Sequence, residues 1–403
     1  MIEPDVSPRD LEAWAAILLD HSLGGIGPED RVMIKGERIG WPLMEVLERR
    51  VVEAGAVPDV LLVPPNNDRG RVWSAAVARH GTPERMARVP AWHEARYASF
   101  TKYVEVLGAE APERFAGLDA ARAQALVAAD RPFTDARISK RWVITLYPTP
   151  AMAAFEGIPF EEYVRFVVGA SITDPRPLKS AEDLLAPIFR DGKRVTVVTE
   201  SPGGRERTLS LDIGPCLPAL SYGLRNVPDG EIYTSPVASA TEGELYLDLP
   251  NSDAGNEIRG ISLRFEKGRI VDFGAEVGEE HLRAIVETDE GSRRLGEFAL
   301  GMNPGLARVL KHPLFVEKVG GTVHVALGAS YAHCYVDDPS SEAGKKRLAE
   351  LADAGVLNRS ARHVDLVADF RPGGCGRSVR IDGRELVVRD GVWVLGPDVG
   401  GGP

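Results

Sequence analysis

The chain has 403 residues, of which 44% are hydrophobic and 27% charged, and its formal net charge is −11. This length suggests two domains on a prior of roughly 150 residues each, and the composition is ordinary for a globular enzyme. The sequence contains no apolar run near the ~20 residues that span a bilayer. The acidic balance speaks against nucleic acid, because polyanions bind basic surfaces.

The N-terminus and the cysteines indicate a cellular location. The first residues are acidic, with no basic stretch ahead of an apolar core, which argues against a secretory signal. Cys216, Cys334 and Cys375 are widely spaced and odd in number, so neither a disulfide framework nor a thiolate zinc site is predicted. We therefore expect a cytoplasmic protein with no membrane partner.

The first half of the chain alternates strand-like and helix-like segments. A strand at 30–36, a helix at 41–56 and a buried strand at 57–63 predict a parallel α/β unit, because parallel neighbours need such a crossover. Later segments predict a helix at 94–107, a strand at 141–148 and a helix at 159–171. We expect an N-terminal parallel α/β, Rossmann-like domain over 1–185, with the boundary near residue 185, where a polar helix at 180–189 gives way to a β-rich region.

The second half, 186–403, predicts a β-rich α+β domain. Two Asp-Gly pairs, Asp382-Gly383 and Asp390-Gly391, are typical of tight hairpin turns. Two helices are expected, at 279–291 and 305–313. Strands are predicted at 194–200, 206–214, 244–250, 258–277 and 379–395. The glycine-rich segments 371–376 and 396–403 are expected to be a loop and a tail.

Familiar short catalytic motifs are missing from the sequence. It has no GxSxG nucleophile elbow, no GxxxxGK[ST] phosphate loop, no GxGxxG after a strand and no HExxH zinc helix. Function must therefore be sought in polar residues that stand within apolar strands.

The first such residue is His324. In the segment 320–331 a period of two places Thr322, His324 and Ala326 on one strand face and the valines on the other. Small neighbours leave room for a group against the imidazole. Taken alone, a core histidine with satisfied hydrogen bonds is the simpler interpretation.

A second pair is His363 and Asp365, which are two residues apart and therefore side by side on one strand face. An imidazole and a carboxylate in this arrangement can chelate one ion. The alternative, which is favoured for the pair by itself, is a surface or turn position.

Three glutamates complete the candidate set. Glu231 and Glu297 each follow a glycine and precede apolar residues, and Glu317 precedes Lys318. A buried carboxylate is costly unless a cation compensates it. Singly, each is better explained by solvent exposure, or for Glu317 by pairing with Lys318. As a set, these residues exceed the three protein ligands usual at one catalytic zinc and suit two divalent ions that share a carboxylate and a water.

At these residues the chain resembles the aminopeptidase T / aminopeptidase S family of metallopeptidases. The resemblance extends over nearly the whole chain, with weaker support at 54–62 and 146–166. The chain departs from the family at 204–209, where it reads GRERTL and relatives often have a GTDL-like segment. The resemblance therefore does not identify substrate contacts at these positions. The strongest stretches are 226–236, 261–304, 314–331 and 358–366.

The resemblance implies a homodimeric two-domain α/β enzyme that removes N-terminal residues from peptides with a free N-terminus, using two divalent metal ions (zinc, cobalt or manganese). Glu297 matches the bridging glutamate, and Tyr331 matches the active-site tyrosine. Glu317 lies in a stretch of variable spacing. The implied metal ligands are Glu231, Glu297, Glu317, His324, His363 and Asp365.

These roles suggest a mechanism as a hypothesis. Two metals would lower the pKa of a shared water, and one would bind the free α-amino group of the substrate. Tyr331 would donate a hydrogen bond to the developing oxyanion, with a core tyrosine as the structural alternative. Either Glu297 or Glu317 would carry the proton to the leaving amine.

Two rival functions remain open from the sequence. Ring-cleaving dioxygenases that act on dihydroxypyridines look like distant relatives and would use His324, His363 and Asp365 for one ferrous ion. The additional glutamates Glu231 and Glu297 argue against that single-metal site. A metal-stabilised scaffold or peptide-binding protein without turnover is the second rival, and the complete ligand set argues against it.

Overall fold

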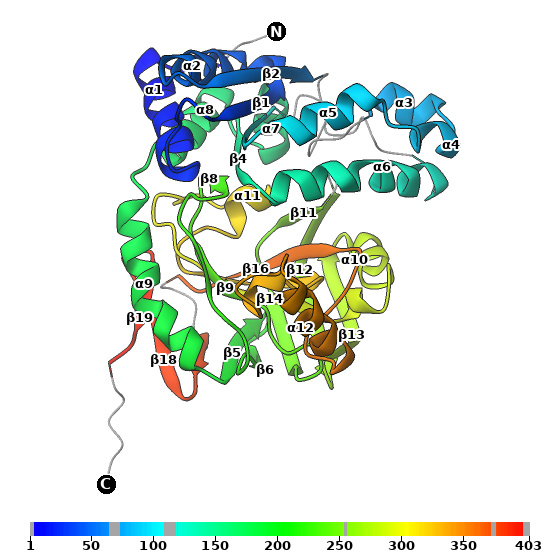
Figure 1. The fold of residues 1–403 in the computed structure, drawn as a ribbon. Helices are drawn as coiled ribbons and strands as arrows, with labels where there is room; N and C mark the ends of the chain where they lie inside the picture. The colour runs from blue at the N-terminus through cyan, green and yellow to red at the C-terminus, as the bar shows by residue number, and fades with distance from the viewer. Residues whose placement is uncertain are drawn as a thin grey trace. The chain divides into compact units, whose positions relative to one another are not determined.

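The computed structural model describes residues 4–63, 73–108, 118, 120–253, 256–371 and 376–397 (Figure 1). The chain forms two compact units, one of Met1–Asp174 with Gly223–Pro228 and the other of Pro175–Tyr222 with Asp229–Pro403. The division therefore falls earlier than the boundary predicted near residue 185. Helix α9 (Arg176–Asp191) belongs wholly to the second unit, because it packs against β7, β9 and β19 of that unit.

The first unit contains a wholly parallel five-stranded sheet with the order β2-β1-β3-β4-β8. This confirms the parallel α/β fold predicted for the N-terminal half. The short strand β8 is supplied by the segment that returns to this unit after the start of the second one. The strands are β1 (Arg31–Glu37), β2 (Val57–Val63), β3 (Lys102–Leu107), β4 (Arg141–Leu146) and β8 (Asn226–Val227).

One helix prediction in this unit was wrong. The segment 94–107 contains the end of helix α5 and then strand β3, whose Tyr103, Val104 and Val106 are buried in the centre of the sheet. Burial on both faces removes the alternation that marks a half-exposed strand, so local periodicity misled. The helices are α1 (Pro8–Ala16), α2 (Trp41–Glu53), α3 (Ala75–His80), α4 (Pro83–Met86), α5 (Ala91–Ser99), α6 (Ala120–Ile138), α7 (Pro150–Glu156) and α8 (Phe160–Ser171).

The second unit contains two sheets, which confirms a separate β-rich region. The larger has the strand order β11-β12-β10-β6-β5-β17-β18-β19, with β13 also paired to β12. Its strands are β5 (Arg194–Ser201), β6 (Arg205–Asp212), β10 (Glu242–Leu247), β11 (Asn251–Asp253), β12 (Asn256–Glu266), β13 (Arg269–Val277), β17 (Ser378–Ile381), β18 (Arg384–Arg389) and β19 (Val392–Leu395). Asp382 and Asp390 adopt φ of 49° and 51° at the two hairpin turns predicted from the Asp-Gly pairs.

The smaller sheet is antiparallel and has the order β16-β15-β14-β9-β7. One hydrophobic core joins the two sheets, since side chains from β14, β15 and β16 pack with side chains from β5, β6, β10 and β12. The opposite face of the smaller sheet therefore points away from this core. Its strands are β7 (Ala219–Ser221), β9 (Glu231–Thr234), β14 (Leu295–Gly301), β15 (Thr322–Gly328) and β16 (His363–Asp369).

The helices predicted in this unit need correction. The segment 279–291 is helical only as α10 (Glu279–Val286), and 305–313 is irregular up to the short α11 (Pro313–Val316). Leu306 and Leu310 are both buried, so their helix-like spacing reflects two core contacts made by non-helical chain. Helix α12 (Glu342–Asp353) was not predicted. The loop and tail expected at 371–376 and 396–403 lie mostly outside the described residues.

Candidate metal centre

The candidate centre lies on the face of the small sheet that turns away from the core. In β15, Val323, Val325 and Leu327 pack in the core, so the alternation sends His324 to the other face. The same alternation in β16 buries Val364 and Leu366 in the core and places His363 and Asp365 on the same face of the sheet as His324. The strand faces predicted for these three residues are those observed.

Glu297 reaches this face through a β-bulge. Leu295 lies opposite Leu327 and Glu297 opposite Ala326, so two steps along β14 match one step along β15. Leu295 packs in the core, and the extra residue lets Glu297 point the other way. Only glycine fits between them, because a Cβ at Gly296 would lie 2.2 Å from the carbonyl oxygen of Ala329.

Glu231, Glu297 and His324 form the first group of potential ligands, whose ligand atoms all lie within 4.8 Å of one another. Nε2 of His324 is 3.1 Å from Oε2 of Glu231 and 3.6 Å from Oε1 of Glu297. All three side chains are buried. Oε2 of Glu231 has no hydrogen-bond partner among the described residues, which is unusual for a buried carboxylate oxygen.

Glu297, His363 and Asp365 form the second group, under the same distance limit. Nε2 of His363 is 3.0 Å from Oε2 of Glu297 and 3.6 Å from Oδ1 of Asp365. Glu297 thus belongs to both groups and turns one oxygen toward each. This is the arrangement expected of a carboxylate that bridges two cations.

The ring of His363 is oriented by the backbone. Its Nδ1 lies 2.8 Å from the carbonyl oxygen of Ala329, which can only accept a hydrogen bond, so Nδ1 carries a proton. Nε2 is then the atom that faces Glu297 and Asp365. Histidines that bind metals commonly have their second nitrogen fixed in this way.

The pKa shifts reflect crowded carboxylates. Burial would lower the pKa of His363, but Asp365 and Glu297 outweigh burial and raise it to about 9. Burial would raise the pKa of Glu297, but the neighbouring imidazoles of His324 and His363 hold it at about 2. Burial and the nearby Glu317 raise the pKa of Asp365 well above its usual range. In the metal-free chain, protonated imidazoles therefore compensate part of the negative charge.

Glu317 falls in neither group of the described residues. Its Oε1 lies 3.0 Å from Nζ of Lys318, which also contacts Glu231 and lies 3.5 Å from Oδ1 of Asp229. The pairing of Glu317 with Lys318 that the sequence suggested is present, although both side chains are buried. The sequence analysis missed Asp229, which stands two residues before Glu231.

Helix α9 supplies a further acid that the sequence analysis missed. Glu182 is fully buried, and burial together with Asp229 and Glu231 raises its pKa to about 10. It is therefore neutral at physiological pH. The spacing of α9 gave no signal for it, because its neighbours Asp229 and Glu231 come from a distant segment.

Tyr331 lies at the edge of the second group. Its ring centroid is 4.6 Å from that of His363 and 5.2 Å from that of Tyr233. Burial, Glu297 and Asp365 raise the pKa of its phenol well above the ordinary value. The hydroxyl therefore keeps its proton and can donate a hydrogen bond.

The donor set fits divalent metal ions. It combines imidazole nitrogens with carboxylate oxygens, the ligands that zinc, cobalt and manganese accept. Besides Oε2 of Glu231, Oδ1 of Asp365 and Nδ1 of His324 are buried without hydrogen-bond partners among the described residues. A cation in each ligand group would satisfy the carboxylate oxygen of Glu231 in the first and that of Asp365 in the second.

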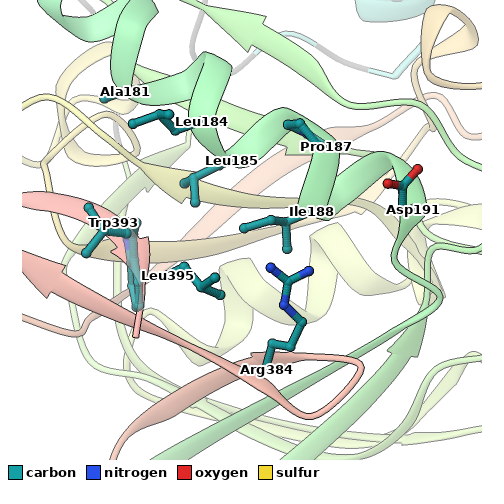
Figure 2. Close-up of a pocket in the computed structure, with 10 residues that line it drawn as sticks. Ala181, Leu184, Leu185, Pro187, Ile188, Asp191, Arg384, Trp393 and Leu395 are labelled. Carbon is teal, nitrogen blue, oxygen red and sulfur yellow. The ribbon is translucent and has the colours of Figure 1, made fainter. Parts of the chain in front are cut away.

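A separate cavity of about 410 Å³ lies between α9 and the β18–β19 hairpin (Figure 2). Leucine and isoleucine side chains of α9 face Trp393 and Leu395 across it, with Arg384 at one side. None of the potential ligands described above lines it. The potential metal ligands therefore lie on the face of the small sheet and not in this cavity.

One segment of the chain matches a known protein family. Residues 219–393 match the family described as thermophilic metalloprotease (M29), and this span contains all six predicted ligands and Tyr331. The matched residues make up fewer than half of the chain.

Two curated relatives are similar to part of this chain. Aminopeptidase AmpS of Bacillus subtilis is 34% identical over 182 residues, which are 43% of this chain and 41% of that protein. Aminopeptidase T of Thermus thermophilus is 35% identical over 182 residues, 42% of this chain and 40% of that protein. The alignments thus span about two fifths of the length of these relatives.

Solved structures resemble the fold over a longer range. Wild-type AmpT from Thermus thermophilus has a TM-score of 0.69 at 23% identity and covers 96% of this chain, which in turn covers 97% of it. The 2,5-dihydroxypyridine dioxygenase from Pseudomonas putida KT2440 has a TM-score of 0.54 at 13% identity. This match covers 96% of this chain and 98% of the dioxygenase chain. At these identities the likeness concerns the fold. Among the described residues, none of the helices has the length and apolar character needed to cross a membrane.

Proposed function

We propose that the chain is a metal-dependent aminopeptidase that hydrolyses the first peptide bond of substrates with a free N-terminus. The observation that carries this proposal is the shared carboxylate: Glu297 belongs to two adjacent groups of potential ligands, within a segment of the metalloprotease family. The two curated relatives that match part of the chain are named aminopeptidases.

Charge balance supports two divalent ions. Five carboxylates surround the centre (Asp229, Glu231, Glu297, Glu317 and Asp365), with Lys318 as the buried ammonium among them. With neutral imidazoles they leave four negative charges, which two divalent cations would balance. A buried excess of negative charge without such compensation would be strongly unfavourable.

Glu231, Glu297 and His324 would hold one ion, and Glu297, His363 and Asp365 the other. Two bound divalent ions would supply a hydroxide at neutral pH from a shared water and polarise the scissile carbonyl. The metal is zinc, cobalt or manganese in this proposal, since the donor set accepts all three.

The remaining groups act on protons and charge. Tyr331 keeps its proton and would donate a hydrogen bond to the oxyanion. A glutamate, Glu297 or Glu317, would pass a proton to the leaving amine. Glu317 is favoured, because both oxygens of Glu297 already face imidazoles whereas Glu317 lies outside both ligand groups of the described residues.

The dioxygenase alternative is less well supported by the geometry. His324, His363 and Asp365 do not form one group of mutually close ligand atoms among the described residues, whereas each of the two groups that form contains Glu297. A single ferrous site has no need of that carboxylate.

By family resemblance we further propose that the chain is cytoplasmic and forms a homodimer. Light scattering on the purified chain would test the homodimer.

The test uses one peptide in two forms. We expect the purified chain to bind close to two ions and to release leucine from a leucyl peptide, but not from its N-acetylated form. A chelator should abolish release, and added zinc, cobalt or manganese should restore it. One iron per chain and no hydrolysis of either peptide would instead support the dioxygenase.

A further inference from the structure

Lys318 is buried at 1% exposure in contact with two of the six predicted metal ligands. Its Nζ contacts Oε1 of Glu231 and lies 3.0 Å from Oε1 of Glu317. The second oxygen of Glu231 faces the imidazole of His324 at 3.1 Å. Lys318 therefore takes one oxygen of Glu231 and leaves the other for the ligand group.

The backbone of Lys318 is also held in place, which limits the movement of its side chain. Asn303 donates from its backbone N to the carbonyl of Lys318 at 3.0 Å and from Nδ2 to the carbonyl of Asp229 at 2.6 Å. The Lys318 and Asp229 segments are thus tied to one residue, and Nζ lies 3.5 Å from Oδ1 of Asp229. Such a fixed charge does not need to reorganise when a ligand arrives.

We propose that Lys318 is a positioning residue that occupies one oxygen of Glu231 and, through its charge beside the ligand groups, weakens and tunes cation binding at the centre. The proposal rests on the proposed function, since it assumes that divalent ions bind there. Removing the charge would leave one more uncompensated carboxylate and allow Glu231 to bind with both oxygens. Both effects raise the affinity for a cation.

The alternative is a purely structural ion pair. In that case loss of Lys318 would loosen the segment that carries Glu317 and lower metal affinity. The two roles therefore predict opposite signs for the change in affinity, which makes the measurement decisive.

The experiment measures zinc affinity and stoichiometry of the full chain, stripped by a chelator and titrated in competition with a chromophoric chelator. We expect Lys318→Met to bind two zinc ions with at least about tenfold higher affinity at one of them. Asp229→Asn should do the reverse and weaken binding by about three- to tenfold, because Lys318 then has one negative partner fewer. Lys35→Met is the matched control: Lys35 is equally buried and pairs with Glu105 at 3.5 Å in the first unit, so zinc affinity should not change.

Unchanged or weaker zinc binding in Lys318→Met would overturn the proposed role of Lys318. The proposed function would still hold in that case if the wild type binds two ions. If Lys318→Met does not fold, Asp229→Asn decides, and unchanged or tighter binding in that variant overturns the proposal. A wild-type chain that binds no zinc, cobalt or manganese overturns the proposed function and the role of Lys318 together.

Discussion

Each unit of this chain buries a lysine at 1% exposure, and the two lysines have different surroundings. In the first unit, Lys35 faces one carboxylate, Glu105, which also accepts a hydrogen bond from the hydroxyl of Tyr103 at 2.9 Å. In the second unit, Lys318 faces three carboxylates, and further acids stand beyond them. A structural ion pair is balanced by its own partner, whereas the second cluster carries a negative excess that bound divalent cations would balance.

The largest expected effect comes from removing the shared carboxylate. Glu297→Gln should lose binding of both ions and lower peptide hydrolysis by at least about 10³-fold, because both ligand groups contain Glu297. Metal analysis and leucyl-peptide hydrolysis measure this. Glu244→Gln, which affects a partly exposed glutamate paired with Arg205 and Arg207, is the control and should retain both properties. Full metal content in Glu297→Gln would contradict the view that the acidic residues around Lys318, unlike the Lys35–Glu105 pair, form a cation site.

The next effect separates catalysis from metal binding. Tyr331→Phe removes only the hydroxyl that is proposed to stabilise the oxyanion. We expect kcat to fall by roughly 10²–10³-fold with both ions retained. Unaltered turnover by the metal-loaded variant would leave Tyr331 as a packing residue beside His363 and Tyr233.

The third prediction concerns the stability of the chelator-treated chain. The pKa of His363 is raised to about 9 in the folded state from an ordinary 6.5, so the folded chain binds its proton more tightly than the unfolded chain. The resulting stability is fully present below pH 6.5 and is lost as the pH rises through about 9. The loss should amount to roughly 3 kcal/mol at most.

Denaturant unfolding between pH 6 and pH 10 measures this loss. His363→Asn should flatten the profile of the metal-free chain. The metal-loaded wild type should also show a flatter profile, since a ligated imidazole is neutral throughout. An identical pH profile with and without metal would contradict the assignment of His363 as a ligand.

The smallest effect concerns Glu182. Its folded pKa is raised to about 10, so the folded chain keeps a proton that the unfolded chain releases above about 4.5. The stability that this proton confers is present below 4.5 and is lost progressively as the pH rises toward 10. Glu182→Gln should therefore be more stable than the wild type at pH 8, by about 1–3 kcal/mol. A variant less stable at every pH would show that Glu182 is ionised and paired.

Periodicity and turn chemistry were sufficient where a strand has one buried face. The alternation of apolar residues predicted the strand face of His324 and, on another strand, that of His363 and Asp365, and two Asp-Gly pairs located the last hairpins. The same reasoning failed for Lys102–Leu107, a strand buried on both faces, and for 305–313, where leucines at helical spacing enter the core from irregular chain. Long-range packing decided those segments.

The amino-acid sequence by itself determined the parallel and β-rich halves, the strand faces of the two histidines and Asp365, and, through family resemblance, the six acidic and imidazole candidates. The tertiary structure decided which of them meet. It gave Glu297 its place through a bulge, separated Glu317 from both groups of the described residues and brought Lys318, Asp229 and Glu182 together. The physical reason is that electrostatic and packing partners are set by distance in space. These residues come from α9, the segment just before β9, the turn after α11 and the strands of the small sheet, which lie far apart along the chain.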